Sequence, residues 1–454
     1  MGNNWPTYPL EKCMEAIIDY RGKTPNKTSS GVPLITAKIV KGGRILPVQE
    51  YIAESEYDTW MRRGHPQKGD ILITTEAPLG EVAQLDGRKV ALAQRLITLR
   101  GKKGFLDNTF LKYLLQSHEV QHQIDGRASG TTVSGIKQSE LRKVLLPIPD
   151  FPEQRAIAHI LGSLDDKIEL NRQMNETLEA MAQALFKSWF IDFDPVIDNA
   201  LAAGNPIPEE LQARAALRES LGDARKPLPD DIRNLFPGEF EFTEEMDWIP
   251  KGWKAVPAEN VLDINPRVQL KKNTTAPFVD MKALPTSGFS ITEVSQKAYS
   301  GGAKFNNGDV LLARITPCLE NGKTGIVDFL DGDETGFGST EFIVLRGKGA
   351  VTTPYVACLS RLASFRDHCI QSMVGSSGRQ RVQNACFSNF YLAVPPDNDL
   401  LSNFDLLVRG NFDRITEQTT QNRSLTQLRD NLLPKLLSSE IRIQDAEKLV
   451  EVAV

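Results

Sequence analysis

A long helical pattern that occurs twice constrains the fold of this chain more than any other feature. The stretches "DDKIELNRQMNETLEAMAQAL" (165–185) and "DRITEQTTQNRSLTQLRDNLL" (413–433) lie within regions whose seam positions recur at alternating intervals of four and three. This spacing is the heptad pattern of a helix that packs along one seam against another helix. Polar residues interrupt the seam near its middle in both copies, so the chain uses the same imperfect helix twice.

The duplication extends beyond the helices to most of the chain. Four runs recur in the same order: "GVPLITAKIV" (31–40) as "TAPFVDMKAL" (275–284), "KGDILIT" (68–74) as "NGDVLLA" (307–313), "ITLRGKKG" (97–104) as "IVLRGKGA" (343–350), and "LLPIPD" (145–150) as "LAVPPD" (392–397). The offset stays between about 239 and 247 residues. One long unit is therefore present twice, which differs from the many short repeats of a solenoid.

Within each copy, short β-rich runs end at Gly/Pro turns and alternate with helical segments. We therefore predict an α/β fold with two similar mixed α/β domains. Two long helices separate them and pair as an antiparallel coiled coil, with a pseudo-twofold internal repeat. The predicted segments are a first domain (1–150), a central spacer helix (151–190), an acidic Pro-rich connector (191–247), a second domain (248–396), a C-terminal spacer helix (397–440) and a tail (441–454).

The heptad spacing also assigns the residues of the helix–helix seam. They are Ile157, Leu161, Leu164, Ile168, Asn171, Asn175, Leu178, Leu185, Phe404, Val408, Ile415, Gln418, Asn422, Leu425 and Leu432. In an antiparallel pair the middle of one helix meets the middle of the other, so the amides of Asn171 and Asn175 should face Gln418 and Asn422. A polar seam residue fixes the register at a cost in stability. The alternative is that these side chains face solvent.

Charge is distributed unevenly along the chain. The formal net charge is −5, yet residues 1–150 carry +5 and residues 249–395 carry +4, while 151–248 carry −11 and 396–454 carry −3. Two basic bodies of this kind are a modest electrostatic footprint for a polyanion. The five cysteines include no CxxC pair, so we expect reduced thiols and no structural zinc. No apolar run reaches membrane-spanning length.

Motifs that could carry catalysis are weak. "HEVQH" (118–122) fits the zinc-protease pattern, but no third ligand follows, and the second copy has no matching pair of histidines. "NGKTG" (321–325) lacks the upstream glycine of a phosphate-binding loop, and "GFGS" (336–339) is an isolated pair of glycines. Asp150 and Pro152 are typical of a helix start. The sequence therefore predicts a chain without a catalytic site of its own and without a bound metal.

Two stretches carry a family resemblance. The run "FPEQRAIAHILGSLDDKIELNRQMNETLEAMAQALFKSWFIDFDP" (151–195) resembles the central region of specificity subunits of type I DNA restriction–modification systems. "WIPKGWKAVPAENV" (248–261) resembles the opening of their second target-recognition domain. The two-copy layout covers nearly the whole chain. The second helix departs from the pattern, because it lacks the Glu-Gln-Arg opening.

The resemblance implies a cytoplasmic, non-catalytic, DNA-binding subunit. In such systems the specificity subunit joins two methyltransferase (M) subunits, which bring S-adenosylmethionine, and restriction (R) subunits, which bring ATP hydrolysis with Mg²⁺. No cofactor is expected in this chain. Each domain would read one half of a bipartite, asymmetric target in double-stranded DNA, and the helix pair would set the spacing between the halves and dock the M subunits.

Residue types and loop positions suggest which side chains contact DNA. Phosphates are bound by Lys, Arg and hydroxyl-rich loops, and base edges by Arg, Lys, Asn or Gln. We favour two equivalent Gly-rich loops, 125–138 and 374–384, together with basic residues near strand ends. The candidates are Arg127, Thr131, Thr132, Lys137, Ser376, Ser377, Arg379 and Arg381 in the loops, and Lys38, Arg44, Arg95, Lys282, Arg314 and Lys323 elsewhere.

Two other classes of function are compatible with parts of the pattern. A fused restriction–methylase enzyme would need a methylation motif and a nuclease core, which the sequence does not display. A coiled-coil adaptor without DNA binding would not need two basic domains. A DNA-reading module agrees with both observations.

Overall fold

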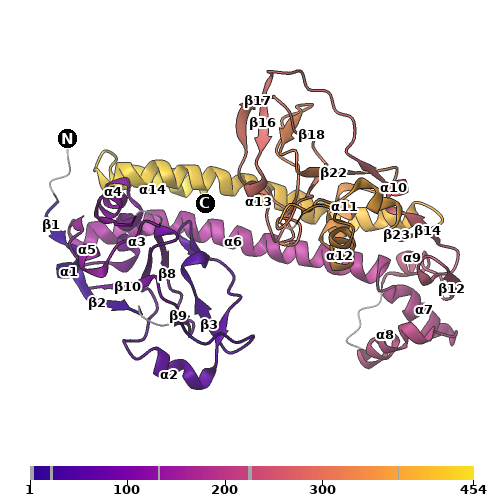
Figure 1. The fold of residues 1–454 in the computed structure, drawn as a ribbon, viewed down its shortest axis with the longest axis horizontal. Coiled ribbons are helices and arrows are strands. Elements are labelled where there is room, and N and C mark those ends of the chain that lie inside the picture. The colour runs from indigo at the N-terminus through magenta and orange to yellow at the C-terminus, as the bar shows by residue number, and fades with distance from the viewer. Residues whose placement is uncertain (1–4, 21–23, 131–132, 223–227, 377) are drawn as a thin grey trace. The chain divides into compact units, whose positions relative to one another are not determined.

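The computed structural model describes residues 5–20, 24–130, 133–222, 228–376 and 378–454. The chain divides into two compact units. Unit 1 comprises residues 1–169 and 424–454, and unit 2 comprises residues 170–423. The long helices α6 (Phe151–Phe190) and α13 (Asp399–Leu437) each pass from one unit into the other, so that each unit contains a segment of both. Figure 1 labels these elements.

Unit 1 is built around a four-stranded antiparallel sheet in the order β2-β10-β7-β8. Its strands are β2 (Met14–Asp19), β10 (Leu96–Gly101), β7 (Ile71–Thr75) and β8 (Leu79–Gln84). Smaller sheets are formed by β1 (Thr7–Pro9) with β11 (Leu145–Pro147), by β6 (Tyr51–Ile52), β3 (Val32–Ile35) and β9 (Ala91–Leu92), and by β4 (Val40–Lys41) with β5 (Arg44–Ile45). Its shorter helices are α1 (Leu10–Cys13), η1 (Ala37–Ile39), η2 (Glu54–Glu56), α2 (Tyr57–Trp60), α3 (Asn108–Gln116), α4 (His118–Arg127), α5 (Gln138–Leu141) and α14 (Ile443–Ala453).

Unit 2 repeats this plan with the order β15-β22-β19-β20. These strands are β15 (Leu262–Ile264), β22 (Phe342–Gly347), β19 (Val310–Ala313) and β20 (Thr324–Ile326). The other sheets are β14 (Lys254–Pro257) with β23 (Tyr391–Val394), β12 (Phe240–Thr243) with β13 (Asp247–Pro250), and β17 (Ser295–Ala298), β16 (Thr275–Val279), β21 (Gly336–Gly338) and β18 (Ala303–Phe305). Its helices are α7 (Asp194–Ala203), α8 (Glu209–Ser220), α9 (Asp230–Arg233), α10 (Ala258–Val261), η4 (Met281–Ala283), α11 (Thr353–Arg361), α12 (Ala363–Gln371) and η5 (Asn384–Ser388).

The repeated sequence runs form equivalent strands in the two units. The run that begins at Asp70 becomes the fully buried strand β7, and the run that begins at Asp309 becomes the buried strand β19. Each aspartate is inaccessible to solvent and binds an arginine of the neighbouring strand, at 2.7 Å from Arg100 and at 2.7 Å from Arg346. A buried carboxylate must be paired. The same ion pair therefore anchors the same two strands in both units.

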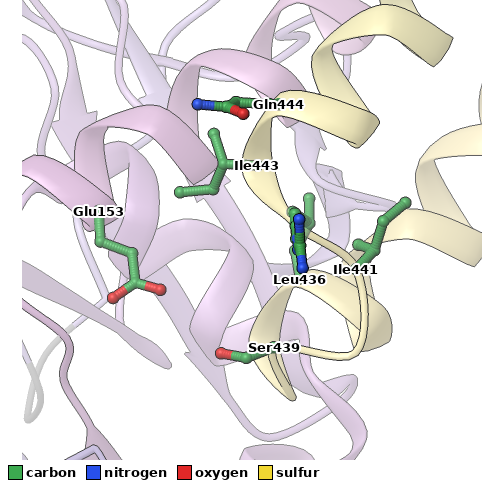
Figure 2. Close-up of a pocket in the computed structure, with 7 residues that line it drawn as sticks. Glu153, Leu436, Ser439, Ile441, Ile443 and Gln444 are labelled. Carbon is green, nitrogen blue, oxygen red and sulfur yellow. The ribbon is translucent and has the colours of Figure 1, made fainter.

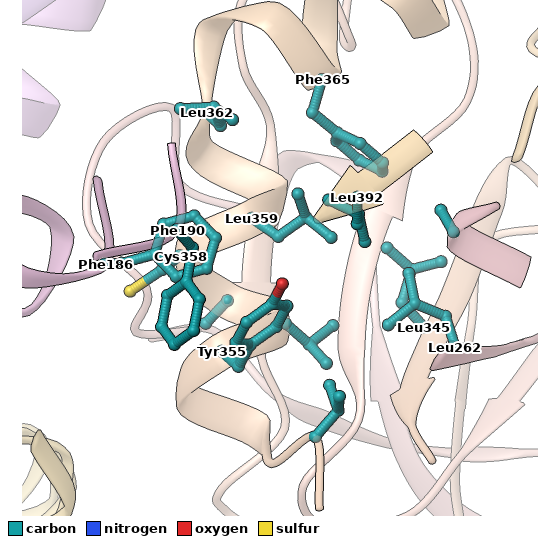
Figure 3. Packing of buried hydrophobic residues seen from close by; sticks show 14 of the residues in the cluster. Phe186, Phe190, Leu262, Leu345, Tyr355, Cys358, Leu359, Leu362, Phe365 and Leu392 are labelled. Atoms are coloured by element: carbon teal, nitrogen blue, oxygen red, sulfur yellow. The ribbon is translucent and has the colours of Figure 1, made fainter. Parts of the chain in front are cut away.

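Each unit has its own apolar core. In unit 1 the sheet packs against α3 and against the unit-1 segments of the long helices, through residues such as Phe110, Leu161 and Leu432. In unit 2 the aromatic end of α6 enters the core, where Phe186 and Phe190 pack edge-to-face against Tyr355. Figure 3 shows this packing. Such aromatic contacts anchor the helix to the sheet domain.

The helix start at Phe151 follows from local capping. The Asp150 side chain accepts a hydrogen bond of 2.8 Å from the Glu153 backbone amide. This bond satisfies one of the first-turn donors that a helix leaves unpaired. Within unit 2 the contacts run in opposite chain directions, from Asn171 with Asn422 to Leu178 with Asn411, so α6 and α13 are antiparallel. The predicted fold class, two similar mixed α/β domains with two long helices that pack together, is confirmed.

The structure adds secondary structure that the sequence pattern left undefined. The predicted tail (441–454) contains α14, whose Ala446 and Val450 are buried in the core of unit 1. The predicted connector (191–247) contains α7, α8 and α9 in its described part. Between β10 and β11 the chain forms the separate helices α3 and α4, because it turns at Ser117, which caps α4. The exact domain bounds stay a prediction.

Candidate nucleic-acid interface

In each unit three chain segments meet at one end of the two central strands of the four-stranded sheet. In unit 1 they are the residue after β7, the residue before β10 and the end of a hairpin, namely Glu76, Arg95 and Gly135. Glu76 and Gly135 form an isolated antiparallel β-bridge, and the backbone amide of Thr75 donates a 2.9 Å hydrogen bond to the carbonyl of Arg95. We call this set the unit-1 junction. The hairpin itself closes through paired hydrogen bonds between Ser129 and Gly135.

The unit-2 junction consists of the equivalent residues Ile315, Glu341 and Arg381. Ile315 and Arg381 form an isolated antiparallel β-bridge, and the backbone amide of Arg314 donates a 3.0 Å hydrogen bond to the carbonyl of Glu341. The hairpin closes through Val374 and Arg381. The loops predicted as equivalent from the sequence are therefore hairpins of the same kind, held against the same strand ends.

A glycine shapes each hairpin at the same place. Gly130 has φ +128° and Gly375 has φ +131°. A Cβ at Gly130 would lie 2.2 Å from the carbonyl oxygen of Val133, and one at Gly375 would lie 2.9 Å from that of Arg379. Side-chain-bearing residues rarely adopt such φ angles and would collide with the backbone here. Glycine is therefore required for the close approach of the two hairpin arms.

Charged residues that follow the carboxyl ends of a parallel strand pair occupy equivalent positions in both units. β3 and β9 are parallel, and Lys38 and Arg95 each follow three residues after the last paired residue. In unit 2, Lys282 and Glu341 follow the parallel pair β16 and β21 at the same distance. The carboxyl ends of parallel strands meet at one edge, so Lys38 and Arg95 share one edge of unit 1, as Lys282 and Glu341 share one edge of unit 2.

The unit-1 candidates differ in their surroundings. Arg95 is exposed, has a left-handed backbone with φ 75°, and its Nε lies 2.6 Å from Oε1 of Glu76. Arg127 is half-buried and lies 3.9 Å from Glu140. Lys38, Arg44 and Lys137 are exposed. Within the described residues, no ion pair ties these three side chains to a carboxylate.

The unit-2 candidates divide into structural and free groups. Arg314 donates from Nη2 to the carbonyl of Val382 (2.9 Å), and Lys323 donates from Nζ to the carbonyl of Met281 (2.8 Å). These bonds fasten the β19–β20 loop to its neighbours. Lys282 lies 3.3 Å from Glu293, with both side chains mostly in solvent. Such an exposed pair contributes little to stability and leaves the lysine available.

Arg379 and Arg381 differ sharply although they share a hairpin. Arg379 is exposed and has no carboxylate partner among the described residues. Arg381 binds Glu341 with two nitrogens: Nε donates at 2.9 Å to Oε2, and Nη2 donates at 2.7 Å to Oε1. The bonds and charge of Arg381 hold the pKa of Glu341 below its usual range. Ser376 is exposed, while Thr131, Thr132 and Ser377 lie outside the described residues.

The sequence interpretation did not identify the two carboxylates of the junctions, Glu76 and Glu341. The repeat alignment places Glu341 opposite Arg95 and Arg381 opposite Gly135, and this exchange of charge could have revealed them. The sequence-based list of candidate DNA contacts also omitted Lys297 and Lys304. These lysines lie over the rings of Phe278 and Tyr299, at 3.8 and 6.0 Å from the ring centroids.

The polar centre of the helix pair lies within unit 2. Asn171 donates from Nδ2 to Oε1 of Gln421 (2.8 Å) and to Oδ1 of Asn422 (2.9 Å). Asn175 reaches the hydroxyl of Thr419 at 3.4 Å instead of an amide. Oδ1 of Asn175 and Oε1 of Gln418 are buried without a partner among the described residues. One amide contact across the seam therefore has the expected form, and the other does not.

The remaining seam residues are placed as follows. Ile157, Leu161, Leu164 and Ile168 are buried in unit 1 with Leu425 and Leu432, and Phe404 and Val408 are buried in unit 2. Ile415 is buried, and Leu178 and Leu185 are half-buried. None of the predicted seam residues is solvent-exposed.

The "HEVQH" motif does not form a metal site in the described part of the chain. His118, Glu119 and His122 of the "HEVQH" motif are exposed on α4, and no cluster of three potential metal ligands occurs among the described residues. A cavity of about 390 Å³ with both polar and apolar lining residues lies at the turn between α13 and α14, against Glu153 (Figure 2). Burial raises the pKa of Glu153, and the nearby Asp150 adds to this effect. No second acid–base group accompanies Glu153 in the cavity lining.

No helix in the described ranges has both the length and the apolar character needed to span a bilayer.

Comparison with known proteins finds similarity to specificity subunits of type I restriction enzymes. Residues 14–180 match the family model of the type I restriction modification DNA specificity domain. The specificity subunit of the type I restriction enzyme MjaIX from Methanocaldococcus jannaschii is 26% identical over 391 residues, which cover 83% of this chain and 79% of that protein. The HindI specificity subunit from Haemophilus influenzae is 27% identical over 417 residues, covering 83% and 87%. The solved S subunit from M. genitalium is 15% identical, covers 95% of this chain and 96% of its own, and has a TM-score of 0.49.

Proposed function

We propose that this chain selects the DNA sequence on which a type I restriction–modification enzyme acts, because residues 14–180 match the family model of the DNA specificity domain of these systems and the chain is similar to two of their specificity subunits. One observation carries the detail of this proposal. The two units share one sheet order and one junction, yet the junction residues differ. A common scaffold with different contact residues is suited to reading two different half-sites of one asymmetric target.

The contact chemistry of both units supports binding to duplex DNA. The exposed side chains of Lys38, Arg44 and Lys137 in unit 1 and of Arg379 in unit 2 are free of carboxylates within the described residues. Free cations of this kind bind phosphates and release counterions. The junction arginines Arg95 and Arg381 are held in a fixed orientation, which suits contact with base edges.

The helix pair is proposed to set the spacing of the half-sites. α6 has 40 residues, which corresponds to about 60 Å at 1.5 Å per residue. One turn of duplex is about 34 Å. The continuous helix is therefore long enough to hold two reading units more than one turn apart, with unread bases between the half-sites.

The same helices are proposed to dock two M subunits, to which R subunits can be added. Leu170, Met174 and Met181 are exposed and lie on one face of α6, since four and eleven residues are close to whole turns. An exposed apolar stripe on a long helix is typical of a partner interface. S-adenosylmethionine, ATP and Mg²⁺ would then be held by the partners, and this chain would be non-catalytic. Because the target is genomic DNA, we expect the complex in the cytoplasm.

Selection from a randomised duplex pool tests the proposal. The full chain, purified together with its methyltransferase partner, is bound to the pool at two salt concentrations, and the retained DNA is sequenced. We expect two short motifs at a fixed separation, and weaker retention at higher salt because phosphate contacts release ions. Retained DNA without any shared motif would contradict the proposal.

A change of helix length tests the spacing proposal separately. Seven helical residues are inserted at opposite points of α6 and α13, which preserves the heptad phase. The separation of the recovered motifs should change while the bases of each half-site stay the same. Altered half-site bases at an unchanged separation would contradict the role of the helices.

A further inference from the structure

The junctions contain a second kind of arginine–carboxylate pair, unlike the one that anchors the sheets. The anchoring pairs, Asp70–Arg100 and Asp309–Arg346, use aligned positions in the same order, and their carboxylate side chains are 1% and 0% exposed. These properties define a structural ion pair. They provide an internal standard for judging the junction pairs of the same two units.

The junction pairs differ from that standard in position and in exposure. In unit 1 the acidic residue is Glu76, directly after β7, and the basic residue is Arg95, directly before β10. In unit 2 the acidic residue is Glu341, directly before β22, and the basic residue is Arg381, at the end of the hairpin. The two arginine side chains are 49% and 42% exposed. Both junctions hold an arginine guanidinium against a carboxylate at the ends of the central strands. The arginine and the carboxylate stand at different aligned positions in the two units.

The backbone at the unit-1 junction points the same way. Arg95 has φ 75°, in the left-handed region that side-chain-bearing residues seldom adopt. Such conformations persist where surrounding structure imposes them and are concentrated at functional sites. A Cβ at Gly135 would lie 3.1 Å from Cβ of Glu76 and 3.2 Å from the carbonyl oxygen of Thr75, so an arginine at the hairpin end of unit 1 would require these neighbours to shift. In unit 1 the junction arginine instead comes from position 95.

The donors that remain free define the ligand. In unit 2 the carboxylate of Glu341 occupies Nε and one N–H of Nη2 of Arg381. Nη1 makes one long contact, 3.4 Å, with the carbonyl of Arg379. The outer N–H groups of Nη1 and Nη2 form a fork that faces away from the carboxylate. A fork of two parallel donors matches O6 and N7 of guanine, which both accept hydrogen bonds in the major groove.

Resting on the proposed function, we propose that Arg381 and Arg95 each read one guanine, one in each half-site, and that Glu341 and Glu76 are positioning residues that aim them. The carboxylate restricts the rotamers of a long side chain before DNA arrives, so less conformational freedom is lost on binding. It also excludes lysine as a replacement, because an ammonium cannot bind the carboxylate and the guanine with two parallel pairs of bonds.

The test is the pool selection described above, repeated with Arg381→Lys and Glu341→Gln in the full chain. Arg381→Lys keeps the charge and one contact to Glu341, so it should fold. We expect the preference for guanine at a single position of one half-site to fall by roughly 5- to 150-fold, the range of a bidentate arginine contact. The other half-site should keep its motif. Glu341→Gln should relax the same position, and Arg95→Lys should relax one position in the opposite half-site.

Controls separate reading from folding. Arg409→Lys alters another exposed arginine of unit 2, which is paired with Asp405 on α13, and should leave both motifs unchanged. Thermal melting of each variant reports on the stability of the hairpin. Unchanged motifs in the Arg381→Lys pool, or a uniform loss of affinity with unchanged base preferences, would overturn the proposal. A wild-type pool without two motifs would instead overturn the proposed function.

Discussion

Loss of the Asp165 carboxylate should loosen unit 1. Asp165 accepts hydrogen bonds from Lys112 (2.6 Å) and Tyr113 (2.7 Å) of α3 and from Arg429 (2.8 Å) of α13. One carboxylate therefore joins three helices of the same unit. Burial raises the pKa of Asp165, but the charges of Lys112 and Arg429 outweigh this effect and lower it overall. The ionised form is thus favoured in the folded unit.

The magnitude follows from what Asp165→Asn leaves behind. The amide cannot neutralise Lys112, whose side chain is only 11% exposed, while Arg429, 24% exposed, keeps its ion pair with Asp430. Removing one partner of a buried ion pair costs about 3 to 5 kcal/mol. Partial hydration of both cations places the expected loss near the lower end, about 3 kcal/mol. This value corresponds to a factor of roughly 150 in the opening equilibrium of unit 1.

Amide hydrogen exchange measures this loss without requiring the whole chain to unfold in two states. Peptides covering α3 (108–116) should exchange roughly 150-fold faster in Asp165→Asn at pH 7. Asp166→Asn is the matched control, because Asp166 is the next residue on the same helix and is exposed. Exchange of α3 within threefold of wild type in Asp165→Asn would refute the view that this carboxylate holds the three helices together.

The same carboxylate predicts an acid limit for unit 1. Its folded pKa lies below its ordinary value, so the stabilisation is present above the unfolded pKa of about 3.9 and is lost as the pH falls through the folded pKa. Wild-type α3 should lose protection on acidification below about pH 4. Asp165→Asn should show a smaller loss over the same range.

The remaining predictions concern single residues of either unit. Asn171→Leu should destabilise unit 2 by about 1 to 3 kcal/mol in urea, because two amide partners lose their donor, whereas Asn175→Leu should raise stability, because it removes a buried acceptor without a partner. Burial raises the pKa of Glu179 to about 7, so stability should fall as the pH rises from about 4.3 to 7, and Glu179→Gln should raise the melting temperature at pH 8 but not at pH 4. Arg95→Gly should leave the melting temperature equal or higher, since it relieves a left-handed backbone, while abolishing the preference for guanine at one position of one half-site.

The fold was predictable because it rests on long-range periodicity and on duplication. The runs around Asp70 and Asp309 are recognisable as buried strands, and their equivalence follows from the repeat alone. The heptad spacing also gave the phase of both long helices, since residues such as Leu161 and Leu432 are buried. These signals extend over many residues, so no single substitution obscures them. Helix α14 was not predicted, because a short terminal pattern carries too few periods to be distinguished from a tail.

The seam amides show where periodicity stops being informative. Heptad spacing placed the Asn171/Asn175 zone opposite the Gln418/Asn422 zone, and the structure contains a hydrogen bond between Asn171 and Asn422. Asn175, however, reaches the hydroxyl of Thr419 and neither of the two predicted amides. The choice between neighbours one residue apart depends on side-chain length and on helix rotation at that point, and neither is encoded in the spacing.

The junction residues could not be predicted from residue type alone. The reason also explains why the two copies of the repeat can diverge at the junctions. Arg314 and Lys323 have the residue types expected of DNA contacts but bind backbone carbonyls of their own unit. Glu341 has the opposite charge but holds Arg381 in place. Burial separates these cases: a buried ion pair cannot change one member without a cost of several kcal/mol, so the pairs of Asp70 and Asp309 stayed alike in both copies. The junction ion pairs are exposed, so replacing one of their members changes the stability very little. The junction residues can therefore diverge between two half-sites. Transplanting the unit-2 pair into unit 1 should therefore require Gly135 and Glu76 to change together, and Gly135→Arg alone should lower the melting temperature without creating a new base preference.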